Sequence, residues 1–109
     1  MTDEQILIIL FLAESTTAAE AELTARIQAR RSGGGWPGGL EEQLRTIQDV
    51  GLPWQSKRLG SVNPVAVCLA LADLERSGLV ECFNPSGRRT VAAKLTEAGW
   101  KLYEGWPNE

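Results

Sequence analysis

The sequence contains no histidine and only two cysteines, Cys68 and Cys82, and neither cysteine belongs to a CxxC pair. A structural zinc site needs four ligands and commonly takes nitrogen from histidine, so we expect no metal site. Proton transfer near neutral pH also usually relies on histidine. We interpret both cysteines as reduced thiols that serve as small apolar residues in a cytoplasmic protein.

The sequence also shows no pattern typical of a nucleotide-binding loop or of a membrane span. The glycine cluster at residues 33–39 lacks the Lys-Ser or Lys-Thr pair of a phosphate-binding loop. The apolar run at residues 6–12 is far shorter than the roughly 20 residues that cross a membrane. Acids precede this run, whereas a signal peptide begins with cations. We therefore expect a cytoplasmic binding protein with no cofactor and no enzymatic activity.

The charge balance excludes a strongly basic protein. Eleven Lys and Arg stand against 14 Asp and Glu in 109 residues, which gives a formal net charge of −3. Such a chain is not a polybasic coat for nucleic acid, but it can bind DNA if its cations gather on one face. Its length suits one domain, and a hydrophobic content of 43% is enough for one core.

Two capping boxes predict two helices near the N-terminus. Residues 2–5 and 17–20 both place Thr three positions before Gln or Glu, a pattern typical of helix starts. The predicted helices cover residues 3–14 and about 17–31. The first is apolar on all sides and needs cover all round. A partner subunit and the inserted middle segment, residues 32–60, are equally good sources of that cover.

Residues 32–60 are predicted to form an inserted loop and a short helix. The glycine-rich start indicates a flexible loop around Trp36. Apolar residues spaced by four and three predict a helix over residues 40–50, which Gly51 would end. We expect this helix, together with Trp36 and Trp54, to cover the apolar outer face of the next helix, so both tryptophans would stabilise the fold.

The pair Asn63-Pro64 is the sharpest local signal in the chain. Asn is a leading N-cap residue, and Pro is favoured at the first helical position. The pair predicts a helix from Pro64 to about Ser77, where Gly78 would end it. Three apolar residues share one face of this helix and are expected in the core: Val67, Leu71 and Leu74.

The remaining sequence predicts a hairpin and a last helix. Strand-forming residues occupy 79–83 and 89–95, and the sequence Asn84-Pro85-Ser86-Gly87 between them is typical of a turn. Thr96 would then cap a helix that carries Trp100. The predicted fold class is therefore mainly α with a small β-hairpin, an α+β arrangement.

Two strings resemble a known family. LERSGLVE at residues 74–81 looks like the junction between recognition helix and wing in winged-helix regulators, and KLTEAG at residues 94–99 looks like the end of their wing. Over residues 61–106 the chain resembles the MarR and PadR groups of bacterial transcriptional regulators, and residues 3–31 fit their first two helices more loosely. The resemblance implies one winged helix-turn-helix domain spanning the chain, with the inserted segment before the recognition helix.

The resemblance implies a DNA-binding transcriptional regulator. In such proteins the recognition helix enters the major groove of double-stranded DNA, and the wing contacts adjacent phosphates. It also implies a homodimer through the N-terminal helix, the C-terminal helix at residues 100–106, or both. The residues expected to contact DNA lie on the wing, on the recognition helix and shortly before it: Lys57, Arg58, Ser61, Asn63, Arg76, Arg88 and Arg89.

The outer face of the predicted recognition helix departs from the family pattern. Opposite its core residues it carries Val65, Ala66, Cys68, Leu69, Ala72, Asp73 and Arg76. Of these, Arg76 alone has the usual base-contacting chemistry, and Asp73 would repel phosphate. The alternative function is a protein–protein interaction module or adaptor subunit whose apolar helix does not read DNA.

Overall fold

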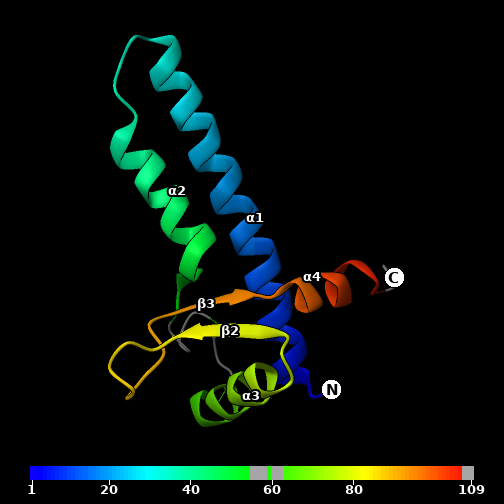
Figure 1. Ribbon diagram of the computed structural model, residues 1–109. Coiled ribbons are helices and arrows are strands. Elements are labelled where there is room, and N and C mark those ends of the chain that lie inside the picture. The colour runs from blue at the N-terminus through cyan, green and yellow to red at the C-terminus, as the bar shows by residue number, and fades with distance from the viewer. Residues whose placement is uncertain (55–58, 60–62, 107–109) are drawn as a thin grey trace.

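The structure, a computed structural model, describes residues 1–54, 59 and 63–106, and these form four helices and a three-stranded antiparallel sheet (Figure 1). The elements follow the order α1 (Asp3–Ser32), α2 (Gly38–Val50), β1 (Leu52–Pro53), α3 (Pro64–Arg76), β2 (Val80–Phe83), β3 (Ala92–Leu95) and α4 (Glu97–Glu104). The predicted mainly helical fold with a small antiparallel hairpin is confirmed.

Helix α1 is continuous, so the prediction of separate helices over residues 3–14 and 17–31 is wrong. The first capping box forms as predicted. At the second, the Thr17 hydroxyl instead donates to the carbonyl oxygen of Ala13, 2.8 Å away in the preceding turn. Residues 14–16 include neither Gly nor Pro, so nothing in the backbone ends the helix there.

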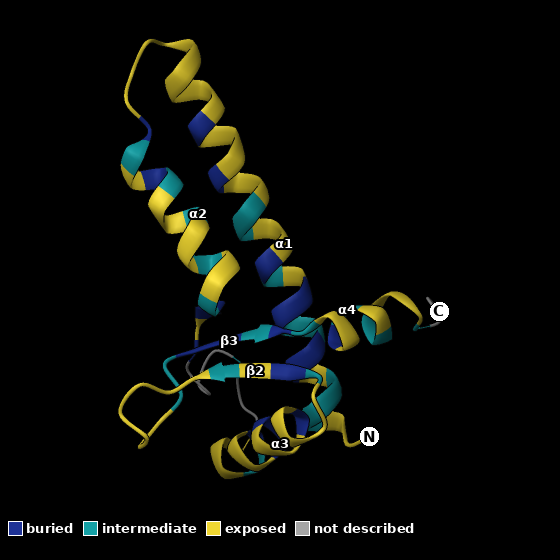
Figure 2. Ribbon diagram, viewed as in Figure 1, coloured by how far each residue is buried: buried dark blue, intermediate teal, exposed yellow. Residues whose placement is uncertain are grey.

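The second half of α1 and all of α2 form a helical hairpin that extends away from the rest of the molecule (Figure 1). Its narrow core consists of buried Leu23, Ile27 and Leu40, with Leu44 and Ile47 packed against them. Most of its remaining surface is exposed (Figure 2). The apolar face of α2 therefore packs on α1, and the expectation that α2 covers α3 is wrong.

The two tryptophans that were expected to cover α3 lie in different parts of the molecule. Trp54 is 7% exposed in the main core, where its ring meets that of Phe11 edge to face with centroids 6.2 Å apart. Trp36 is 84% exposed in the loop between α1 and α2. The prediction of a covering role is therefore wrong for Trp36, which nothing among the described residues buries.

The main core lies between the first half of α1, the sheet and α3. The predicted inner face of α3 is confirmed, because Val67, Leu71 and Leu74 are all buried. From α1, the largest side chains without solvent contact are Ile8, Ile9 and Leu12. The cover for the first half of α1 thus comes from α3, the sheet, α4 and Trp54 of the inserted segment, whereas α2 of that segment packs on the second half of α1.

The sheet has the order β1-β3-β2, with β3 in the middle. The sequence patterns did not predict β1, whose two residues pair with Ala92 and Ala93. Pro53 fits there because an edge strand does not need every N–H. Gly51 ends α2 as predicted, with a positive φ of 96°, and a Cβ at this position would overlap the carbonyl oxygen of Ala93.

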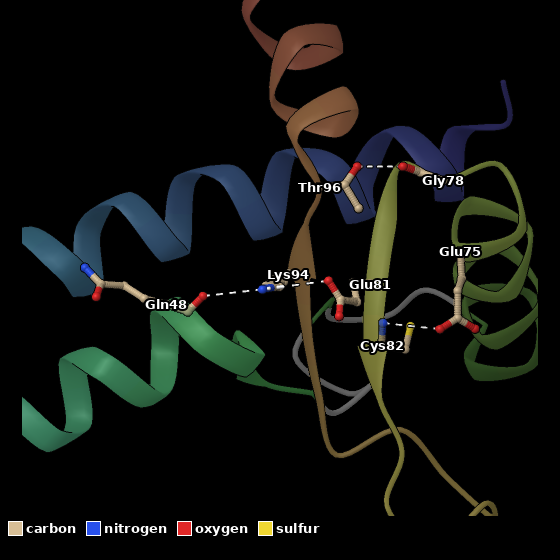
Figure 3. Close-up of polar contacts among 7 residues, drawn as sticks. All are labelled: Gln48, Glu75, Gly78, Glu81, Cys82, Lys94 and Thr96. Atoms are coloured by element: carbon tan, nitrogen blue, oxygen red, sulfur yellow. Dashed lines mark hydrogen bonds and ion pairs between the residues drawn. The ribbon is translucent and has the colours of Figure 1, made fainter.

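Polar contacts fix α2 and α4 to the sheet (Figure 3). The ammonium group of Lys94 lies 3.4 Å from the carbonyl oxygen of Gln48 and 3.7 Å from the carboxylate of Glu81. The Thr96 hydroxyl donates to the carbonyl oxygen of Gly78 at 2.6 Å and accepts from the Gly99 amide at 3.2 Å. Thr96 therefore caps α4, as predicted, and also joins it to the turn after α3.

Candidate nucleic-acid interface

Helix α3 begins at the predicted cap. The side-chain oxygen of Asn63 accepts a hydrogen bond from the Val65 amide at 2.9 Å, and Pro64 is the first helical residue. Asn63 therefore stabilises the start of α3 by occupying one of its free N–H groups. This structural role does not require DNA.

The outer face of α3 is exposed and largely apolar, in agreement with its sequence. Val65 is 67% exposed and Leu69 is 64% exposed. At the far end of the helix, the guanidinium of Arg76 lies 3.2 Å from the carboxylate of Asp73. This ion pair is solvent-exposed, so it holds Arg76 weakly and offsets part of the repulsion that Asp73 would exert on a phosphate.

Arg88 and Arg89 lie in the exposed loop between β2 and β3. We call β2, this loop and β3 the wing. Gly87, with φ of 74°, and a hydrogen bond from the Arg88 amide to the Ser86 hydroxyl at 3.3 Å shape the turn before them. Neither arginine forms an ion pair within the described part of the chain. Both cations are therefore available to a ligand.

A groove of about 680 Å³ separates the wing from α3. Its lining combines both wing arginines with apolar residues and with three other polar ones, Glu75, Asn84 and Thr90: the apolar residues are Trp54, Cys68, Leu71, Ala72 and Cys82. The carboxylate of Glu75 accepts a hydrogen bond from the Cys82 amide at 3.2 Å (Figure 3), which ties α3 to β2. The groove is thus cationic at its wing side, whereas its α3 side is apolar apart from the Glu75 carboxylate.

The Cys82 thiol beside this groove is poorly suited to be a nucleophile. Burial, together with the nearby Glu75 carboxylate, raises the pKa of Cys82 to about 11. The thiolate is the reactive form of cysteine, so its scarcity at neutral pH argues against covalent chemistry here.

We expect iodoacetamide at pH 8 to alkylate exposed Cys68 at least about 10-fold faster than Cys82, since about one Cys82 in a thousand would be ionised. Because the pKa is raised, alkylation of Cys82 should accelerate as pH rises toward about 11. Peptide mapping by mass spectrometry at several times measures both rates. Equal rates at pH 8 would contradict the protected environment of Cys82.

The structure brings only some of the predicted site residues together. Arg88 and Arg89 share the wing, whereas Asn63 and Arg76 lie at opposite ends of α3. The other three predicted residues lie outside the described part of the chain: Lys57, Arg58 and Ser61. Glu75 was missed, because no sequence spacing shows that its carboxylate meets a strand amide in the groove.

A second groove, of about 660 Å³, runs between the first half of α1 and α4. Six of its lining residues are largely apolar: Met1, Ile6, Leu10, Leu102, Tyr103 and Trp106. The other two are the acids Glu14 and Glu104. Leu7 lies nearby on α1 and is also exposed. This surface coincides with the helices that were expected to form a dimer.

The described residues contain neither a cluster of metal-binding side chains nor a helix suited to cross a membrane. No group of three or more Cys, Asp and Glu side chains there is placed to hold a metal ion. No described helix is both long and apolar enough to cross a membrane. The chain matches no protein-family model, and no curated protein or solved structure is significantly similar to it.

Proposed function

We propose that this chain is a winged-helix DNA-binding transcriptional regulator that holds duplex DNA mainly through its wing. The observation that carries the proposal is the position of Arg88 and Arg89, exposed and without ion pairs among the described residues, beside the groove that borders α3. The order α3-β2-β3-α4 is compatible with a recognition helix, a wing and a closing helix. Within this proposal, the inserted segment is the α1–α2 hairpin.

The distribution of charge along the chain supports this assignment. Residues 51–96, which include α3 and the wing, carry six Lys or Arg against three Asp or Glu, a formal net charge of +3. The remainder carries five Lys or Arg against eleven Asp or Glu, a net charge of −6. DNA phosphates would be attracted to the first part, whereas the second part, in which acids outnumber cations, adds no net attraction.

The chemistry of α3 indicates which contacts dominate. Arg88 and Arg89 can form charge-assisted hydrogen bonds to phosphates, and such contacts position a protein without reading sequence. Val65 and Leu69 on the outer face of α3 can touch thymine methyl groups but offer no hydrogen bonds to base edges. The proposed regulator therefore binds DNA with strong salt dependence and modest sequence selectivity.

Replacing Arg88 and Arg89 together with alanine should weaken binding to random-sequence duplex DNA and reduce its salt dependence. Each lost phosphate contact lowers the slope of log affinity against log salt by about 0.9, so a loss of about 1.8 is expected for the pair. Fluorescence anisotropy at several salt concentrations measures both quantities. The matched control is Arg45→Ala with Lys101→Ala, which removes the same charge from exposed sites outside the wing and α3.

Equal losses in the control and wing variants would mean that net charge alone governs binding. Undetectable or salt-independent binding of the wild-type protein to duplex DNA would contradict the proposal.

The second candidate is a protein-interaction module on the same frame, favoured by the exposed apolar face of α3. Val65 and Leu69 expose most of their side chains there, and burial of such side chains is a usual source of affinity between proteins. A stable complex with another protein, recovered after nuclease treatment and lost in Leu69→Glu, would favour this function.

We further propose that the protein acts in the cytoplasm as a homodimer through its N- and C-terminal helices.

A further inference from the structure

The loop between α1 and α2 presents a tryptophan that the protein does not use in its own core. The loop has a defined shape, because the amides of Gly33, Gly34 and Gly35 donate to carbonyl oxygens of the last turn of α1 at 2.8–3.1 Å. Trp36 then lies over Gly38, a residue without a side chain, and remains 84% exposed. A positioned, exposed indole at a protruding end is the kind of side chain that anchors protein interfaces.

The same end of the hairpin is positively charged. Residues 23–40 contain three arginines and no Asp or Glu. Arg31 pairs with Glu41 of α2, whereas Arg26 and Arg30 are exposed and form no ion pair with any described residue. The hairpin end, which we call the tip (residues 26–38), therefore combines one large apolar side chain with available cations.

The groove between α1 and α4 has the opposite character. Its volume of about 660 Å³ has room for an aromatic side chain, and its lining is mostly apolar and includes the carboxylates of Glu14 and Glu104. An indole inserted among Ile6, Leu10 and Trp106 would be removed from contact with water. The arginines that flank the indole would then lie near the two glutamates of the groove. The tip and the groove are thus complementary in both polarity and charge.

The tip cannot reach the groove of its own chain, because they lie at opposite ends of α1 (Figure 1). A helix of 30 residues is about 45 Å long. If two α1 helices lie antiparallel about a two-fold axis near residues 18–21, each tip reaches the groove of the other copy. Glu14 of one chain is then level with Arg26 of the other along the two helices, since both lie six residues from position 20.

We propose that the chain forms a symmetric dimer in which Trp36 of each copy docks into the α1–α4 groove of the other. Three exposed residues near the centre of this arrangement share one face of α1 and are small, Ala18, Ala21 and Ala25, so two α1 helices can approach closely along that face, with exposed Glu22 beside it. The complementary surfaces belong to one chain, which identifies the occupant of the groove as a second copy. This inference deepens the homodimer proposal and does not depend on DNA binding.

Sedimentation analysis of the full chain without DNA tests the proposal. The wild type should sediment as a dimer, and Trp36→Ala should raise the dimer dissociation constant about 30-fold or more, as removal of a central tryptophan does. Because Trp36 is exposed, the variant should keep the helical circular dichroism of the wild type. Leu69→Ala removes another exposed apolar side chain, from α3, and should leave the dimer unchanged.

A charge exchange examines the relative placement of the two chains. Glu14→Arg and Arg26→Glu should each weaken the dimer, and the double variant should recover most of the wild-type affinity. A monomeric wild type, an unaffected Trp36→Ala dimer, or a double variant weaker than both single variants would each overturn the proposal. Failure here would leave the salt-dependent effect of Arg88 and Arg89 on DNA binding intact, so the two proposals fail separately.

Discussion

Replacing Gly99 with alanine is expected to lower the free energy of unfolding by about 3 kcal/mol, because the added methyl group has no space. Gly99 is buried in the first turn of α4, where its amide donates to the Thr96 cap. A Cβ there would overlap the carbonyl oxygen of Leu79 and stand 3.1 Å from Cδ2 of Leu95. The obstacle is backbone, which cannot rotate away as a side chain can.

The matched control for this prediction is Gly39→Ala. Gly39 also lies in the first turn of a helix, but no atom stands within 4 Å of where its Cβ would be. Alanine should therefore stabilise α2 or leave it unchanged, by up to about 1 kcal/mol, because it restricts the unfolded chain. Urea denaturation followed by circular dichroism at 222 nm compares both variants with the wild type.

A loss of about 3 kcal/mol is a large share of the 5–15 kcal/mol by which domains are usually stable. Gly99→Ala should correspondingly lower the melting temperature by about 12 °C or more. A variant as stable as the wild type would mean that α4 does not pack against the Leu79 carbonyl. The α1–α4 groove would then lose the wall on which the proposed dimer depends.

The parts of the fold that sequence patterns predicted best are those with local signals at both ends. Asn63-Pro64 and Gly78 bound α3, and its inner face repeats at helical spacing, so no distant residue was needed to place it. The hairpin and the Thr96 cap depend on similarly short patterns. The strand bounds were less accurate, because β3 begins at Ala92 where pairing with β2 begins, three residues after the predicted start.

The parts that sequence patterns missed depend on distant contacts. Strand β1 has two residues, and only its pairing with β3, some 40 residues later, makes it a strand. The apolar edge of α2 indicated that this helix must pack against something, but spacing within α2 cannot show that Leu23 and Ile27 complete the contact. The wing arginines were found because they flank a turn, whereas the groove beside them exists only in three dimensions.

The positions of the two proposed surfaces make them compatible in one molecule. Figure 1 shows α3 and the tip of the helical hairpin at opposite ends of the fold. A copy docked along α1 therefore does not need to cover the outer face of α3. Because the dimer axis would pass beside the middle of α1, the dimer proposal requires this helix to continue without a break through residues 14–18.

Replacing Ala18 with proline is expected to lower the free energy of unfolding by about 3 kcal/mol or more, because Pro inside a helix removes one hydrogen bond and clashes with the preceding turn. Ala18 is exposed, so the substitution removes no core contact and its effect arises from the backbone. The capping-box pattern makes the opposite prediction. If Thr17 were an N-cap, residue 18 would be the first helical position, where proline is favoured.

Ala18→Gly provides the control, since it should cost only about 1 kcal/mol in a continuous helix. Urea denaturation at one protein concentration measures all three proteins, because dimerisation would add stability that varies with concentration. A proline variant as stable as the wild type would show that the chain bends between residues 14 and 18. The hairpin tip would then lose its fixed distance from the α1–α4 groove, and each tip could no longer reach the partner's groove about one two-fold axis.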